Sequence, residues 1–170
     1  MDLIIRPARA DEPDDVLRLT QAAFAGQGSL DPPSSVFQET ADTVRQAMTE
    51  GVVLVAEHEG RLVGVVRLRA IDDPPALYCG RLAVSGDVQG RGIGSALIAE
   101  AERRARAEGY AAVAVGVRLA LPRNLRIFQN RGYRVVAEHS HPGYDQPTFV
   151  RLLKHVAADG LDGADAKPSD

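Results

Sequence analysis

The sequence predicts an α/β domain in which about four helices flank one mixed, twisted sheet of about seven strands. Three observations point to this fold class. Short β-branched runs alternate with amphipathic helical stretches along the chain. One long helical stretch lies between two strongly apolar runs, which is typical of a parallel strand-helix-strand unit. The 170 residues, 45% hydrophobic and 25% charged, suffice for one domain with its own core.

The N-terminal part predicts one short strand and two helices. Residues 3–6 form the strand, which ends at Pro7. Residues 11–24 carry apolar side chains at helical spacing, and Asp11 is the expected N-cap. Gly, Pro and Ser are frequent in residues 25–35, so a loop is expected there, and residues 36–49 predict a second helix.

The middle of the chain predicts three consecutive antiparallel strands. Residues 52–57 and 62–70 are rich in β-branched side chains, and residues 58–61 between them have the composition of a hairpin turn. Residues 72–75 are expected to form a loop before a third long strand over residues 76–84.

The C-terminal half predicts a helix over residues 92–108, a strand over 111–117, a helix over 123–131 and two closing strands over 133–139 and 148–155. Glycines at positions 109 and 132 supply the helix stops. We expect a right-handed crossover around the long helix, with its two flanking strands parallel. Residues 1–156 should form a single domain, and the small and acidic residues 157–170 a flexible tail.

Composition excludes several classes of function. The net charge is −3, the pI is about 5.8 and no basic stripe is present, so no nucleic-acid partner is expected. No apolar run approaches the ~20 residues of a membrane span, and the N-terminus lacks a signal-peptide pattern. We therefore expect a cytoplasmic protein without membrane contact. Cys79 is the single cysteine, which excludes an internal disulfide and argues against a metal site.

A glycine-rich turn precedes the long helix and is the most informative local pattern. It reads Gln89-Gly90-Arg91-Gly92-Ile93-Gly94-Ser95. The first N–H groups of a helix have no internal acceptor, and glycines allow a bulky anion to approach them, so the turn predicts a diphosphate site. A dinucleotide-binding fingerprint would need a third glycine where Ser95 stands, and the P-loop lysine is absent. A turn that serves only tight packing is the alternative.

Gln89-x-x-Gly92-x-Gly94 resembles the acetyl-CoA signature of the GNAT superfamily of N-acetyltransferases, and it lies in the same strand-turn-helix context. A second segment, residues 124–133, is similar to the family's Asn…Tyr-x-x-x-Gly-Phe pattern. The resemblance covers roughly residues 3–155. It implies the GNAT-type fold and acetyl transfer from acetyl-CoA to a primary amine by direct attack in a ternary complex. The acceptor would be a small-molecule or peptide amine, and an unpaired sheet edge is compatible with a homodimer.

The resemblance also implies site residues. The pantetheine arm of coenzyme A would pair with the main chain of one strand, the pyrophosphate would lie in the turn, and the short helix would line the channel. The residues implied to bind the cofactor are Leu82, Ala83, Val84, Gln89, Gly90, Arg91, Gly92, Ile93, Gly94, Ser95, Asn124, Phe128 and Arg131. In this architecture, the loop over residues 25–35 borders the acceptor pocket.

One departure affects catalysis. Many family members carry a tyrosine at the position of Phe128, where it is thought to protonate the departing thiolate, and phenylalanine has no proton to give. The alternative is therefore a non-catalytic CoA-binding sensor or partner-binding module.

Three residues are candidates for catalysis. The Val84 N–H is a candidate donor to the oxyanion, and Tyr78 and Tyr144 are candidate proton shuttles. Packing on the sheet is the alternative for Tyr78, and a solvated hairpin is the alternative for the Tyr144 loop, which also holds His139 and His141.

Arg67 and Arg69 alternate with apolar residues on one predicted strand. They either meet an anionic group of the substrate or face solvent.

Overall fold

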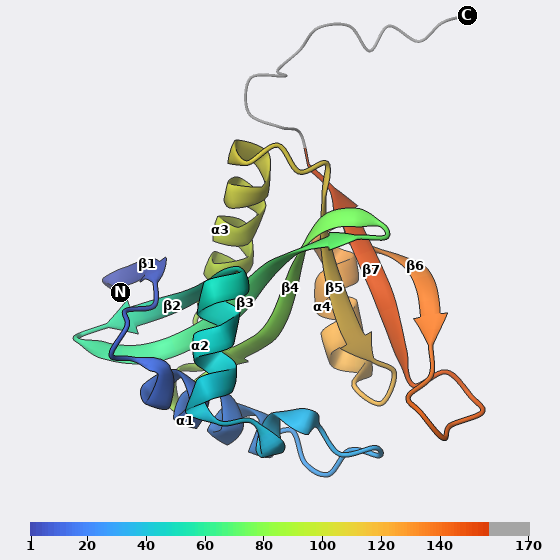
Figure 1. Ribbon diagram of the computed structural model, residues 1–170, viewed down its shortest axis with the longest axis horizontal. Helices are drawn as coiled ribbons and strands as arrows, with labels where there is room; N and C mark the ends of the chain where they lie inside the picture. Colours follow the sequence, from blue (N-terminus) through green and yellow to red (C-terminus); the bar gives the residue numbers. More distant parts are fainter. Residues whose placement is uncertain (157–170) are drawn as a thin grey trace, which may run out of the picture.

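A computed structural model describes residues 1–156 and contains one seven-stranded sheet in the order β1-β2-β3-β4-β5-β7-β6 (Figure 1). The strands are β1 Leu3–Pro7, β2 Val52–His58, β3 Arg61–Asp72, β4 Pro75–Val84, β5 Ala112–Arg118, β6 Arg134–His139 and β7 Phe149–His155. The helices are α1 Pro13–Ala25, α2 Ala41–Glu50, α3 Ile93–Ala107 and α4 Pro122–Asn130, with short 3-10 turns at Ser35–Gln38 and Gly86–Val88. The predicted fold class, a mixed sheet flanked by helices, is confirmed.

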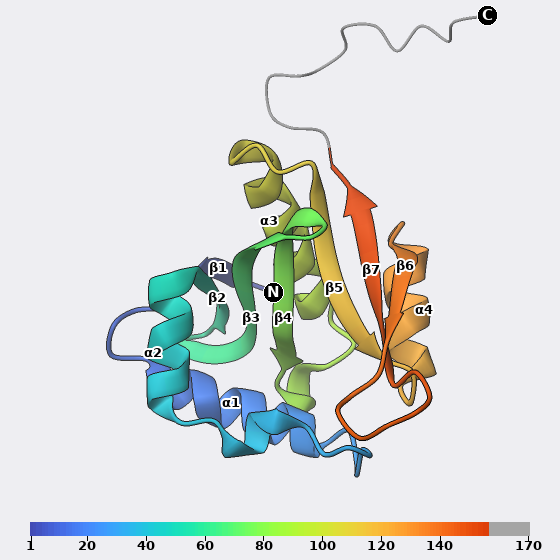
Figure 2. The same ribbon diagram turned by 45° about the vertical axis from the view of Figure 1, so that its right-hand side comes forward.

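Helices cover both faces of the sheet (Figure 2). The larger core cluster joins α3 and the neighbouring aromatic residues of α4 to one face, with Leu54, Leu97, Val113 and Leu152 among its fully buried members. A second cluster packs α1 and α2 against the opposite face of β2 and β3. On that opposite face α1 also packs against β4, while β5 and β7 carry small or half-buried side chains such as Ala112, Ala114 and Leu153.

Three predicted boundaries were wrong, for local reasons. Helix α1 begins at Pro13 after Glu12 and not after Asp11, because proline suits the first helical position and the Glu12 carboxylate bonds the Arg9 N–H. The predicted helix over residues 36–49 is divided into a 3-10 turn and α2, which Thr40 starts through a reciprocal capping box with Thr43. Strand β3 continues through Asp72, so the predicted loop over residues 72–75 shrinks to a tight turn.

Strands β4 and β5 are parallel, as predicted, but they pair over only a few residues. Leu77, Tyr78 and Cys79 pair with Val113, Ala114 and Val115. Beyond these three pairs the strands diverge toward their C-terminal ends, which is visible in Figures 1 and 2. The divergence coincides with an irregular register between β3 and β4 at Arg81, whose φ of +52° is rare for a residue with a side chain. The parting strands leave an opening at the centre of the sheet.

A buried carboxylate links α3 to α4 and β7. Glu102 on α3 is 5% exposed. It accepts a hydrogen bond of 3.0 Å from the Tyr133 hydroxyl, and it pairs with Lys154 at 3.1 Å and Arg131 at 3.5 Å. Burial and the neighbouring Glu102 carboxylate raise the pKa of Tyr133, so this phenol stays protonated and serves structure. Tyr133 packs in the core, as its place after Gly132 predicts.

We expect Tyr133→Phe to lower the free energy of unfolding by about 2 kcal/mol, because a buried carboxylate loses a donor. Urea denaturation monitored by circular dichroism measures the change. Tyr110→Phe is the matched control, since Tyr110 is half-buried at the far end of α3 and its hydroxyl has no hydrogen-bond partner within residues 1–156. Equal stability of the Tyr133→Phe variant and the wild type would contradict this account of Glu102.

Candidate active site

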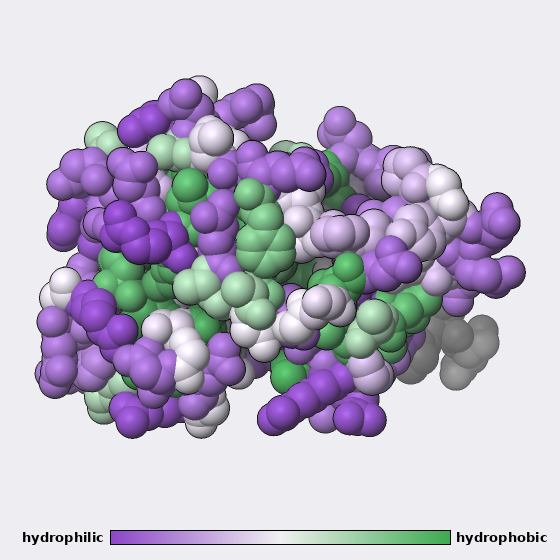
Figure 3. Space-filling view, turned by 90° about the horizontal axis from the view of Figure 1, so that it is seen from below, coloured by the Kyte–Doolittle hydropathy of each residue, from purple (hydrophilic) through white to green (hydrophobic). Residues whose placement is uncertain are grey.

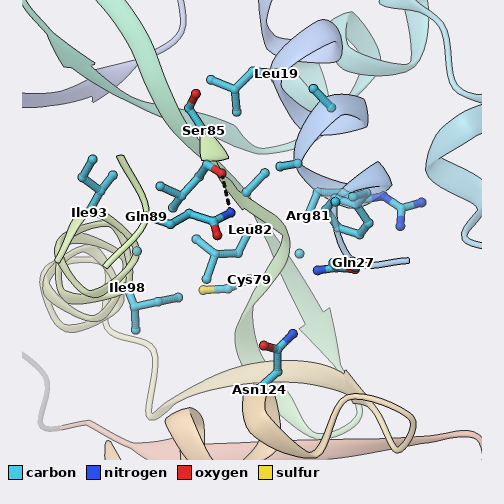
Figure 4. Close-up of a pocket in the computed structure, with 18 of the residues that line it drawn as sticks. Leu19, Gln27, Cys79, Arg81, Leu82, Ser85, Gln89, Ile93, Ile98 and Asn124 are labelled. Carbon is cyan, nitrogen blue, oxygen red and sulfur yellow. Dashed lines mark hydrogen bonds between the residues drawn. The ribbon is translucent and has the colours of Figure 1, made fainter. Parts of the chain in front are cut away.

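A cleft of about 1520 Å³ lies where β4 and β5 part. Four parts of the chain form its walls: β4, the turn that precedes α3, the helix α4, and the segment that follows α1 (Figure 4). Cys79, Gln89 and Asn124 point toward the cavity from three of these walls. Figure 3 views this end of the molecule, where hydrophobic surface gathers near the middle and hydrophilic side chains form the rim. The cleft passes from the α3 side of the sheet to the opposite face, so it can receive two ligands from two directions.

The turn before α3 has the geometry of an anion site. Gly92 is the N-cap of α3 with φ +82°, Gly90 has φ +80°, and no side chain caps the helix. A Cβ added to either glycine would meet no atom within 4 Å, so open space lies in front of both. Gln89 holds the turn against the strand, because its side-chain amide donates to the Val84 carbonyl at 3.1 Å. The amides at the start of α3 therefore face a space large enough for a diphosphate.

The edge of β4 offers main-chain groups to the cleft. The Ser85 N–H bonds the Val63 carbonyl of β3 at 2.8 Å. Because successive residues of a strand direct their N–H groups to opposite sides, the Val84 N–H points away from β3 toward the edge that β5 has left. This is the N–H that the sequence predicts as the oxyanion donor. It is available to an extended ligand lying between the strands.

The opposite wall comes from α4. Phe128 lies edge-on to Tyr133 with ring centroids 5.4 Å apart, and it lines the cleft together with Asn124 and Arg131.

Cys79 is buried, and burial raises the pKa of its thiol to about 12. A thiol held neutral in this way is a poor nucleophile, which argues against an acyl-enzyme on Cys79.

Tyr78 reaches the point where the strands separate. A Cβ added to Gly80 or to Gly116 would lie 3.0 Å from the Tyr78 ring or hydroxyl, so the side chain occupies the room that these two glycines leave. Arg69 and Arg151 each place a guanidinium 4.8 Å from the centre of the ring. The hydroxyl lies over Gly116, beside the opening between β4 and β5, and Tyr78 lines the cleft.

Polar groups surround the end of the cleft opposite α3. Arg81 bonds Glu39 and Ser35, and Arg118 donates to the Pro32 carbonyl at 2.7 Å. His141 also lines this end, where burial and the Arg118 cation lower the pKa of its imidazole. Residues 27, 30, 34 and 35 of the predicted loop border the same end.

Most of the predicted cofactor residues lie together. All of them except Arg91 line the cleft, and Arg91 is exposed. Tyr144 does not line it, because its hydroxyl donates to the Asp31 carboxylate on the rim. That hydrogen bond raises the pKa of Tyr144. The solvent-facing alternative is wrong for Arg67, which pairs with Glu39 at 2.8 Å and has a side chain only 13% exposed.

Sequence reasoning missed Arg81 and Arg118 as residues of the site. Arg81 stands directly before the predicted Leu82, yet only the irregular register with its positive φ turns it into the cleft. Arg118 follows an apolar strand without any pattern that marks it. Within residues 1–156, no group of three His, Cys, Asp or Glu side chains is arranged to hold a metal ion, and no helix is long and apolar enough to cross a membrane.

Comparison with known proteins gives a family and a fold. The model of the acetyltransferase (GNAT) family matches residues 17–133, more than half of the chain. The search of curated proteins found no match to this chain.

Among solved structures, the chain is similar to the GNAT-family acetyltransferase of Streptococcus pneumoniae, with 15% identity, a TM-score of 0.72 and coverage of 92% of this chain and 100% of that one. It is similar to a GNAT family acetyltransferase of Elizabethkingia anophelis with acetyl-CoA bound, at 19% identity, TM-score 0.66 and coverage of 91% and 98%. It is also similar to N-acetylglutamate synthase of Neisseria gonorrhoeae, complexed with coenzyme A and N-acetyl-glutamate, at 20% identity and a TM-score of 0.71. That match covers 92% of this chain and 35% of the synthase chain. At such identities these likenesses carry the fold alone.

Proposed function

This chain belongs to the acetyltransferase (GNAT) family, and we propose that it transfers an acetyl group from acetyl-CoA to a primary amine by direct attack in a ternary complex. The observation that carries the proposal is the cleft between β4 and β5. The cleft extends from the uncapped amides at the start of α3, on one side of the sheet, to a polar chamber on the other side. Arg81, Arg118 and His141 line this chamber. Such a passage lets a thioester and an amine meet from opposite directions.

The residues present fit coenzyme A. The open space in front of Gly90 and Gly92 suits its diphosphate, and the edge of β4 from which β5 diverges suits its extended pantetheine arm. Asn124 and Phe128 line the channel between these two regions. The Elizabethkingia anophelis neighbour carries acetyl-CoA on the same fold, which supports this ligand.

Bound acetyl-CoA supplies an acetyl thioester, and the chain's own groups handle charge and protons. The Val84 N–H donates to the carbonyl oxygen that gains negative charge during attack. A lysine-like amine has a pKa near 10.4 and must lose a proton before or during attack. The Tyr78 hydroxyl accepts the amine proton as it passes its own proton to water in the cleft, and the imidazole of His141 borders the same chamber. The departing thiol has an intrinsic pKa of about 8.5, so it leaves without a dedicated acid.

Two measurements test the proposed function. Acetyl-CoA should raise the melting temperature of the protein, since a ligand that binds only the folded state stabilises it. Release of free thiol from acetyl-CoA in the presence of a panel of primary amines should exceed the release without amine. If acetyl-CoA stabilised the protein but no amine increased thiol release, the transfer function would be rejected in favour of the sensor alternative.

The sensor alternative rests on Phe128, because its ring gives no proton to the thiolate. The nearby Tyr133 does not substitute for it, since the Tyr133 hydroxyl is buried against Glu102 and the pKa of Tyr133 is raised.

We expect Phe128→Tyr to keep the affinity for acetyl-CoA within a factor of about three and to raise kcat several-fold, since a hydroxyl here adds an acid near the thiol. Steady-state kinetics and calorimetry measure both effects. Phe128→Leu, which removes the ring without adding a hydroxyl, is the control and should not raise kcat. A large loss of affinity in Phe128→Tyr would mean that Phe128 does not border the sulfur end of the channel.

A further inference from the structure

Five arginines gather on the sheet face opposite α3 and α4, around the far end of the cleft. They are Arg67 and Arg69 on β3, Arg81 on β4, Arg118 on β5 and Arg151 on β7. Register places Arg69 beside Tyr78 and Arg151 beside Gly116 on this face, and Arg81 shares the Glu39 carboxylate with Arg67. The chain as a whole has a net charge of −3, so this positive charge is a local concentration.

The countercharge on this face is small. Glu39 alone pairs with two of the arginines, Arg67 at 2.8 Å and Arg81 at 2.9 Å. The Asp31 carboxylate accepts from the Tyr144 hydroxyl. Within residues 1–156, no carboxylate lies within ion-pair distance of Arg69, Arg118 or Arg151, and the Nε groups of Arg67 and Arg151 are buried without an acceptor. Five guanidinium groups therefore face two carboxylates.

Arg81 and Arg118 differ from the other three because they line the cleft itself. They belong to the two strands that diverge, so they approach the chamber from opposite walls. Within residues 1–156, the only hydrogen bond of the Arg118 side chain goes to the neutral Pro32 carbonyl. Burial and then the Arg81 cation lower the pKa of the Arg118 guanidinium, as expected for a charge that lacks a counterion. An anion between the two strands would relieve this repulsion.

Two segments that are linked to each other border the chamber at this end. The segment between β6 and β7 is tied to the segment after α1 by the hydrogen bond between Tyr144 and Asp31. The Arg118–Pro32 hydrogen bond makes a second tie to that segment, and Phe149 and His141 form the adjoining wall. This linked border favours a small-molecule acceptor over an amine on a protein surface.

The charge lies at a useful distance from the reacting centre. The Tyr78 hydroxyl lies over Gly116, and Arg118 is two residues farther along the same face of β5. Two residues of a strand span about 7 Å. An anionic group held by Arg118 thus leaves an amine a few bonds away close to the Tyr78 hydroxyl and to the opening between the strands.

We infer that the acceptor is a small primary amine that carries a carboxylate or phosphate group, and that Arg118 and Arg81 bind this group. The inference rests on the proposed function for the identity of the second substrate. The anion site itself stands on the arrangement of the arginines and predicts binding whether or not transfer occurs.

Paired ligands test the inference. The CoA-loaded protein is titrated by calorimetry with L-amino acids and their carboxamides, and with aminoethyl phosphate and ethanolamine. The same pairs, together with spermidine and a tripeptide amide, serve as acceptors in a thiol-release assay. We expect at least one anionic member to bind and react about 10-fold or more better than its neutral partner. The amino acid and phosphate arms distinguish the two kinds of anion.

Arg118→Gln should lower binding and kcat/KM for the preferred anionic ligand about 100-fold and leave the affinity for acetyl-CoA unchanged. Arg134→Gln is the matched control, since Arg134 is exposed on β6 and has no carboxylate partner within residues 1–156; it should keep the preference. An Arg118-dependent preference in calorimetry without any turnover supports the anion site and rejects only the proposed transfer. No preference in either assay, a preference for spermidine or the tripeptide amide, or an unchanged preference in Arg118→Gln overturns the inference.

Discussion

Replacing Gly92 with glutamate is expected to reduce the affinity for coenzyme A at least about 100-fold. The new carboxylate would project into the open space before the first amides of α3, where the diphosphate is proposed to lie. Two unit charges about 4 Å apart at a protein surface repel by about 4 kcal/mol, which is more than enough for this loss. Calorimetric titration with coenzyme A measures the change.

Gly109→Glu is a closely matched control for Gly92→Glu. Gly109 stands at the other end of α3, has the same φ of +82°, and has no atom within 4 Å of an added Cβ. Both variants pay the same cost of about 1–2 kcal/mol for a side chain in the left-handed region. Coenzyme A binding should be lost only at position 92. If both variants bound it as the wild type does, the start of α3 would not be the diphosphate site.

Tyr78→Phe is expected to lower kcat about 100-fold, the usual effect of removing a group that moves a proton in the transition state. The KM for acetyl-CoA and the melting temperature should stay close to those of the wild type. Phenylalanine keeps the ring that packs between Arg69 and Arg151, so the substitution removes the hydroxyl alone. Steady-state kinetics across a range of pH provide the measurement.

The Tyr110→Phe variant controls for the loss of a phenol elsewhere and should retain full activity. Residual activity in Tyr78→Phe should also rise with pH more steeply than in the wild type, because the amine must then lose its proton to water. A purely structural role for Tyr78 would leave the shape of the pH profile unaltered. If kcat stayed within twofold of the wild type, another group of the chamber, such as His141, would have to relay the proton.

Local patterns in the sequence were enough to predict the elements on the α3 side of the cleft. The turn from Gln89 to Ser95 and the helix after it are adjacent in the chain, and their chemistry follows from helix ends and glycines. The elements were also predictable, since each has its own period of apolar residues. Their boundaries failed where one side chain decided the outcome, as Thr40 does at the start of α2.

The opposite side of the cleft could not be predicted in the same way. It is assembled from β3, β4, β5, β7 and two loops, so no local pattern contains it. Its arginines converge only because β7 inserts between β5 and β6 and because β4 is irregular at Arg81. Strand order and register irregularities of this kind depend on long-range packing. The sequence left open whether Arg67 and Arg69 meet an anionic group or face solvent, while it gave no sign that Arg81 and Arg118 line the cleft.

The three residue pairs between β4 and β5 are the only main-chain seam between the two parts of the sheet in residues 1–156. An extended ligand inserted below that seam would complete the ladder that the strands themselves leave open. A bound substrate would then connect the two parts of the sheet and slow the exchange of amide hydrogens in β4 and β5. Without a ligand, the two parts of the sheet would move relative to each other where β4 and β5 meet, and a bound ligand would restrict this motion.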